Sequence, residues 1–167
     1  GVLFMNRKFL LNNPPHFAGA YSDSRFDLSS KTLDFLDVAS REEYGTRNYP
    51  IIAGLGSAVE FIESIGIDRI EKRGKELSSL FKNKISSNPN IEYLSPTEDS
   101  CKSSIVTFRI KNKDNLEISR SIRKTKKLRI RGIYENNLNS LRASFAIFNT
   151  EDEVSLLADT ILELASD

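Results

Sequence analysis

One stretch near the C-terminus, residues 141–154, constrains the fold of this chain more than any other. Its first half alternates apolar and other side chains, as in a strand with one buried face. The apolar set is Leu141, Ala143, Phe145 and Ile147, and the opposite set is Arg142, Ser144 and Ala146. Thr150 and Glu153 then have the spacing of a capping box. Apolar residues at helical spacing follow, namely Val154, Leu157, Ile161 and Leu164. The stretch therefore predicts a strand, a turn and a capped amphipathic helix.

Arg142 is the unusual residue of this stretch, because it lies on the face opposite the core where a strand of small residues begins. Most arginines are solvated, and that is one interpretation. The other is anion binding, since a guanidinium can donate two parallel hydrogen bonds to one carboxylate. Arg131 ends the preceding predicted strand and is a second candidate for the same pocket.

The sequence of residues 141–154 resembles the C-terminal signature of class V aminotransferases. It reads Leu-Arg-Ala-Ser-Phe-Ala-Ile-Phe-Asn-Thr-Glu-Asp-Glu-Val. These pyridoxal 5'-phosphate (PLP) enzymes of fold type I include cysteine desulfurases and isopenicillin-N-epimerase-like proteins. The resemblance implies that Arg142 holds the α-carboxylate of an amino-acid substrate and that PLP is the cofactor of the complete enzyme. It also implies a homodimer.

A second informative run is residues 43–50, where Gly45 and Thr46 precede a predicted helix that opens at Pro50 and Ile51. A Gly-Thr loop before a helix can hold a phosphate, although an ordinary turn has the same composition. The run resembles the Phe-Glu-x-Gly-Thr-x-Asn segment of the same family. The resemblance implies that Gly45 and Thr46 reach across the dimer to the PLP phosphate of the other subunit.

The chain opens on an apolar run, Gly1 to Phe4, which reads as a short strand, with no initiator methionine. In the resembling family such a strand ends the sheet of the large domain and follows the lysine that binds PLP. We therefore expect that lysine upstream of Gly1, since Lys8 is not at its position, and no catalytic residue in this chain. The expected domains are residues 1–50, the tail of the large PLP-binding domain, and residues 51–167, the small C-terminal domain. A large-domain chain or segment is then an expected partner.

The middle of the chain alternates between helical and strand patterns. Helices are predicted over about 51–65, ending at Gly66, from Asp68 as cap to about 85, and from Asn115 to Thr125 with Asp114 as cap. Strands are predicted at 91–93, 104–110 and 128–132, and a helical turn within 27–37. Gly74 would weaken its helix by about 1 kcal/mol relative to alanine. The order predicts an α+β two-layer sandwich, with mostly antiparallel strands and helices on one face.

Composition excludes several classes of function. The 167 residues carry a net charge of +1, so no overall field favours nucleic acid or an anionic membrane, and we expect neither as a partner. The basic run within residues 120–131 reads as a solvated helix end and strand. Cys101 is the single cysteine, which fits a reducing, cytoplasmic compartment, and we read it as incidental. His16 is the only histidine, most simply an exposed loop residue with catalysis as the alternative, and no metal-ligand cluster is expected.

The favoured function is the C-terminal portion of a PLP-dependent enzyme acting on an amino acid. The predicted loop at 132–140 contains no cysteine, whereas cysteine desulfurases carry their sulfur-accepting cysteine there. Epimerase, lyase or aminotransferase chemistry therefore stays open. The alternatives are a desulfurase-like protein without that cysteine and a non-catalytic interaction module derived from such a domain, so whether the chain is itself an enzyme is left open.

Overall fold

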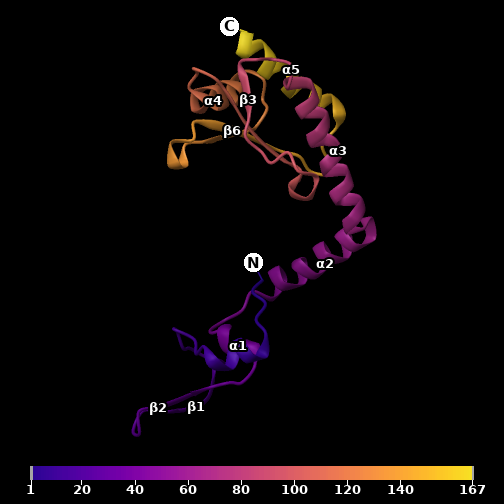
Figure 1. Ribbon diagram of the computed structural model, residues 1–167. Helices are drawn as coiled ribbons and strands as arrows, with labels where there is room; N and C mark the ends of the chain where they lie inside the picture. Colours follow the sequence, from indigo (N-terminus) through magenta and orange to yellow (C-terminus); the bar gives the residue numbers. More distant parts are fainter. Residues whose placement is uncertain (1, 167) are drawn as a thin grey trace. The chain divides into compact units, whose positions relative to one another are not determined.

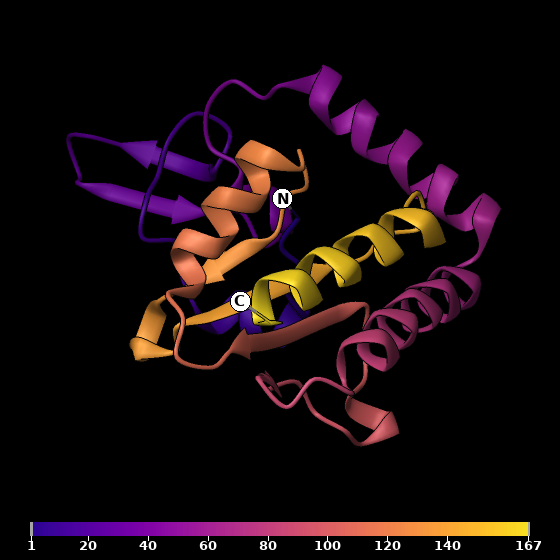
Figure 2. The same cartoon turned by 90° about the horizontal axis from the view of Figure 1, so that it is seen from above.

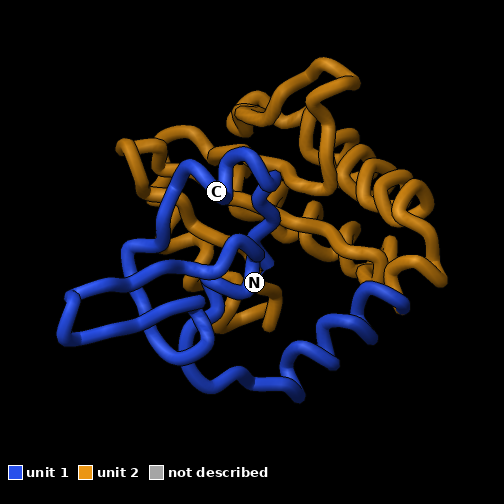
Figure 3. Tube along the Cα trace, turned by 90° about the horizontal axis from the view of Figure 1, so that it is seen from below, with its two compact units in different colours: residues 1–60 blue, residues 61–167 orange. Residues whose placement is uncertain are grey.

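The structure is a computed structural model that describes residues 2–166, and the chain divides into two compact units, residues 1–60 and 61–167 (Figure 3). The first unit contains α1 (Arg7–Asn12), the antiparallel hairpin of β1 (Asp23–Asp27) and β2 (Thr32–Phe35), and a 3₁₀ turn (Ala39–Glu42). Helix α2 (Tyr49–Ile65) begins in this unit and runs past the boundary. The prediction of a helix opening near Pro50 is confirmed.

Two sequence predictions in the first unit are wrong. The helical turn expected within 27–37 is the β1–β2 hairpin, whose turn is fixed by Asp27 accepting from the Ser29 amide at 2.9 Å. The strand expected up to Phe4 is absent from its described residues, 2–4, which are exposed. A strand needs a neighbour to pair its backbone groups, and no described strand lies beside this segment.

A buried arginine organises the inside of the first unit. The Arg41 guanidinium is 4% exposed and donates to the backbone carbonyls of Leu10, at the end of α1, and Asn13, the latter at 2.7 Å. These charge-assisted bonds join the end of α1 to the segment that precedes the Gly45–Thr46 loop.

The second unit is a four-stranded antiparallel sheet covered on one face by three helices (Figures 1 and 2). The strand order is β3 (Ile91–Tyr93), β4 (Ile105–Ile110), β6 (Ser140–Ser144), β5 (Arg131–Ile133). The helices are α3 (Ile67–Ile85), α4 (Asn115–Thr125) and α5 (Glu151–Ser166), and α3 packs against α5. This is the predicted α+β architecture, and the prediction is confirmed.

The core lies between the helices and the inward face of the sheet. Phe81 of α3 sits at its centre, with its ring 5.3 Å from that of Phe108 and 5.5 Å from that of Phe145. The other buried members alternate along the strands or recur along the helices, including Leu77, Ile85, Val106, Ile110, Ile118, Ile122, Leu141, Ala143, Val154 and Ile161. The outward face of the sheet therefore carries the other alternate residues.

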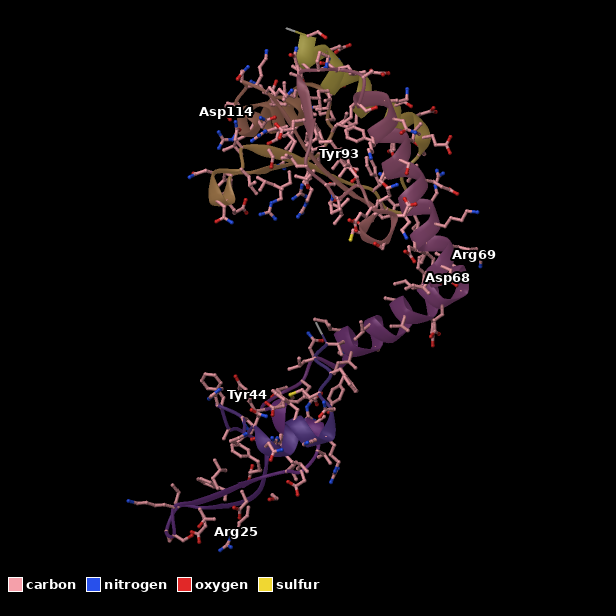
Figure 4. The ribbon with its side chains drawn as sticks, viewed as in Figure 1. Arg25, Tyr44, Asp68, Arg69, Tyr93 and Asp114 are labelled. Atoms are coloured by element: carbon pink, nitrogen blue, oxygen red, sulfur yellow. The ribbon has the colours of Figure 1, made fainter. Side chains whose placement is uncertain are left out.

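Two of the three helix N-caps predicted from the sequence are present in the structure. Thr150 and Glu153 form the predicted capping box, with the Glu153 amide donating to Thr150 Oγ1 at 3.2 Å and the Thr150 amide donating to the Glu153 carboxylate at 3.0 Å. Asp114, labelled in Figure 4, caps α4 as predicted. Asp68 does not cap α3, because the helix already starts at Ile67 after Gly66, whose φ is +94°.

Strand β6 is shorter than its alternation predicted. It ends at Ser144 because Asn149 closes a turn, exchanging hydrogen bonds of 2.9 and 3.0 Å with the backbone of Ala146.

Within residues 2–166 no single helix is long and apolar enough to cross a membrane. Helices α2 and α3 reach that length and hydropathy only as a pair bent by 74°.

Candidate functional site

Arg142 lies in the middle of the sheet of the second unit, on the outward face that the helices leave open. Strand β6 has neighbours on both sides, and the register places Arg142 opposite Thr107 of β4 and opposite Arg131 of β5. The Arg142 side chain is half-buried, and its Nε is shielded from solvent without a hydrogen-bond partner among the described residues. A buried donor of a charged group is costly when unpaired, so this nitrogen is a place where an acceptor is expected to bind.

Arg142 and Arg131 line the same cavity, of about 500 Å³, which we call the arginine pocket. Its other lining residues are Ser119, Arg120, Arg123, Arg129, Ile130 and Ser144. No carboxylate is among these lining residues. Two of its arginines are neutralised, Arg131 by Glu135 and Arg120 by Glu117. Arg123, Arg129 and Arg142 form no ion pair with any described residue, so the pocket is strongly electropositive.

Two local features of the backbone bring these arginines together. A Cβ at Gly132 would lie 2.8 Å from Leu116 Cδ1 and 3.2 Å from Leu116 Cα, so glycine favours the close approach of α4 to β5. The second feature corrects a prediction, because the strand expected over 128–132 pairs only from Arg131. The segment before it, residues 127–130, pairs with no described strand and starts from Lys127, whose φ is +59°. This splayed segment contains Arg129, which lines the pocket.

The basic run at 120–131 was read from the sequence as a solvated surface. The structure agrees, because Arg120, Arg123, Arg129 and Arg131 are all exposed, and it adds that these four residues line one concave pocket together with Arg142. Sequence alone showed only that the run was basic. The signal that could have revealed the pocket is Gly132, whose small size is needed where the helix meets the strand.

The Gly45–Thr46 loop belongs to the first unit and is held in a defined shape. Gly45 has φ of +84°, and its amide donates to the Ala20 carbonyl at 2.9 Å, so this amide is already occupied. Thr46 is exposed and makes no hydrogen bond with a described residue, which leaves its amide and hydroxyl free for a ligand. Of the two residues expected to contact a phosphate, Thr46 therefore fits that role directly. Gly45 fits as the residue that shapes the loop.

The neighbours of this loop restrain it further. Arg47 forms an ion pair with Glu43 at 3.2 Å, and its guanidinium carbon lies 5.7 Å from the centre of the Tyr21 ring. Tyr44, labelled in Figure 4, has its ring 6.3 Å from that of Phe17. At the start of α2, the side-chain oxygen Oδ1 of Asn48 accepts a hydrogen bond of 3.2 Å from the Ile51 amide. The Thr46 amide thus precedes a helix N-terminus, where anions are stabilised.

The remaining sequence candidates lie apart from these features. His16 is an exposed loop residue, and Cys101 is an exposed free thiol in a 3₁₀ turn (Asp99–Cys101). The loop between β5 and β6 contains a 3₁₀ turn (Glu135–Asn137) and no cysteine. Among residues 2–166 no group of three or more His, Cys, Asp or Glu side chains is arranged to hold a metal ion.

Comparison with known proteins assigns the family. The probable cysteine desulfurase of Methanothermobacter thermautotrophicus is 26% identical over 152 residues, which are 83% of this chain and 37% of that protein. Among solved structures, the apo cysteine desulfurase from Thermococcus onnurineus NA1 matches 98% of this chain and 42% of its own, with a TM-score of 0.85 and 20% identity. A C-DES variant with glycine covalently linked to its PLP cofactor matches 90% of this chain and 37% of its own, with a TM-score of 0.71 and 18% identity.

The two structural likenesses concern the fold, and the chain spans about two fifths of the length of these three proteins. The sequence profile of the family described as Aminotransferase class-V matches residues 1–157, which is nearly the whole chain. The expected family is therefore confirmed, and this chain belongs to the class V aminotransferases.

Proposed function

We propose that this chain is the C-terminal portion of a PLP-dependent enzyme that acts on an amino acid, and that Arg142 binds the α-carboxylate of the substrate. The observation that carries the proposal is the Arg142 Nε, which is buried and has no partner among the described residues, while Arg142 lines a cavity whose other lining residues include no carboxylate. A carboxylate accepting from Nε and a terminal nitrogen would satisfy this donor with two parallel hydrogen bonds. Arg131, opposite on β5, lines the same cavity and is a second donor there, although its charge is paired with Glu135.

The cofactor is PLP, as the class V family and the PLP-bound C-DES structure support. When bound, PLP supplies an electron sink for bonds at the α-carbon of an amino acid. The residues of this chain orient the substrate and hold the cofactor. Arg142 holds the carboxylate in place and so restricts the orientation of the bonds at the substrate's α-carbon. Thr46 donates from its amide and hydroxyl to the cofactor phosphate, in the other subunit of a homodimer.

The reaction class is narrowed by the loop between β5 and β6. The relatives are named as cysteine desulfurases, but residues 132–140 offer no thiol to accept sulfur. We therefore favour epimerase, lyase or aminotransferase chemistry over sulfur transfer through a cysteine of this loop. The single free cysteine supports a reducing, cytoplasmic compartment as the place of action.

The test is the substitution Arg142→Ala in the PLP-loaded enzyme that contains this chain. The lost charge-assisted contact is of order 1.5–3 kcal/mol, so kcat/KM should fall by about tenfold to a hundredfold. The affinity for PLP should not change. The matched control is Arg109→Ala, which removes an arginine of the same sheet face whose charge is already paired with Glu92 at 2.8 Å.

Equal kcat/KM values for Arg142→Ala and the unmodified enzyme would refute the assignment. A complete enzyme that binds no PLP and turns over no amino acid would favour the non-catalytic interaction module instead.

A further inference from the structure

The arginine pocket holds more positive charge than one α-carboxylate requires. A single bidentate contact with Arg142 satisfies that carboxylate. Arg123 and Arg129 line the same cavity, and neither forms an ion pair with any described residue. Both side chains are exposed, so solvent screens their mutual repulsion and leaves the two charges available to an anionic ligand.

These two arginines come from different elements than Arg142. Arg123 lies near the C-terminal end of α4, and Arg129 lies on the splayed segment before β5. Gly132 lets α4 approach the strand, so the pocket is bounded by the sheet on one side and by this helix and segment on the other. The pocket therefore offers Arg142 for one anionic group and two further unpaired arginines, Arg123 and Arg129, for another.

We propose that Arg123 and Arg129 bind a second anionic group, so that the substrate is an amino acid whose side chain ends in a carboxylate or a group of similar charge. The proposal rests on the proposed function, in which Arg142 takes the α-carboxylate. A nucleic-acid strand fits the pocket less well, because no aromatic side chain lines it for bases to stack on. The net charge of +1 also gives the chain no general field for polyanions.

The test uses the purified chain and two small probes of similar length, glutarate with two carboxylates and butyrate with one. Binding is followed by NMR on the Nε–H signal of Arg142, which reports the site without any need for turnover. Glutarate should bind about tenfold more tightly than butyrate, and Arg123→Ala or Arg129→Ala should remove most of that preference while butyrate binding is kept. Lys124→Ala is the matched control, since it removes one charge from α4 outside the pocket and should keep the preference.

The outcomes separate the two claims. If Arg142 responds to both probes with equal affinity, or if Lys124→Ala lowers the preference as much as Arg123→Ala does, the second anionic site is refuted and the carboxylate site stands. If the Arg142 signal responds to neither probe, the assignment of Arg142 is itself refuted. In that case both proposals fail.

Discussion

Replacing Gly74 of α3 by alanine should destabilise the second unit, although glycine is a poor helix former. In an open helix the change would stabilise by about 1 kcal/mol. Here the added Cβ would lie 2.7 Å from Ser104 Cβ, closer than non-bonded carbon atoms approach. The expectation from sequence, that Gly74 is only a weak spot, is therefore corrected by the close approach of the chain just before β4.

The size of the expected change in the free energy of unfolding depends on whether Ser104 can move away from the added Cβ. The Ser104 Cβ is fixed to a backbone whose carbonyl accepts from the Phe145 amide at 2.9 Å, so relief requires the helix or the strand to shift. Overpacking of this kind costs about 1–3 kcal/mol, and a contact this short with little freedom belongs in the upper half of that range. After the helix gain of about 1 kcal/mol is subtracted, Gly74→Ala should lower the free energy of unfolding by about 1–2 kcal/mol.

The assay is urea unfolding followed by circular dichroism, on a double-mutant cycle with Ser104→Gly. That second change removes the obstructing carbon, so Gly74→Ala should become neutral or stabilising in its presence, with a coupling energy above about 1 kcal/mol. Gly54→Ala in α2 is the matched control, because its added Cβ would meet no atom within 4 Å and should not destabilise. A stabilising effect of Gly74→Ala in the otherwise unmodified chain would refute the reasoning.

Four further predictions concern the site, the caps and the attachment of the cofactor. Backbone and side-chain hydrogen bonds from Thr150 and Asn149 hold the pKa of Glu153 below its usual value. Its contribution to stability is therefore present at neutral pH and lost as pH falls through the lowered pKa, so Glu153→Gln should lower the urea midpoint at about pH 7 and lower it less as the pH is reduced below the usual glutamate range. Thr46→Ala should weaken PLP binding about tenfold and leave the fold intact, as measured by cofactor titration and circular dichroism. Hybrid dimers that pair a subunit lacking the PLP lysine with a subunit altered at Gly45 and Thr46 should recover up to about half of the activity, whereas active parent dimers or inactive hybrids would contradict action across the dimer. Borohydride reduction of the 167-residue chain with PLP should mark no single lysine stoichiometrically, and one such lysine would place the cofactor's attachment within this chain.

The elements that sequence predicted well are those determined by near neighbours. Thr150 with Glu153 and Asp114 with α4 satisfy amides within three residues, and the alternation at Val106 and Phe108 reflects one buried face. Such patterns do not depend on the rest of the fold. The α+β architecture followed from their order.

The elements that sequence missed depend on long-range packing or on unusual backbone angles. The β1–β2 hairpin shows no alternation, because neither of its strands has a buried face. The early start of α3 left Asp68 inside the first turn. The arginine pocket depends on positive φ at Lys127 and on the contact of Gly132 with α4, neither of which a run of basic residues reveals. Arg142 itself was found because its sequence context resembles a known signature, while its unpaired Nε could be seen only in the structure.

The most direct test of the central claim pairs the substitution of Arg142 with removal of the group that it is proposed to bind. In the PLP-loaded enzyme, the dissociation constant is measured for an amino acid and for the amine that lacks its carboxylate, in the unmodified form and in Arg142→Ala. The account predicts that the unmodified enzyme binds the amino acid at least tenfold more tightly than the amine and that Arg142→Ala loses most of this preference. The reason is that substituting Arg142 and omitting the carboxylate each remove the same contact. A preference that survives in Arg142→Ala would show that another group binds the carboxylate and would contradict the account.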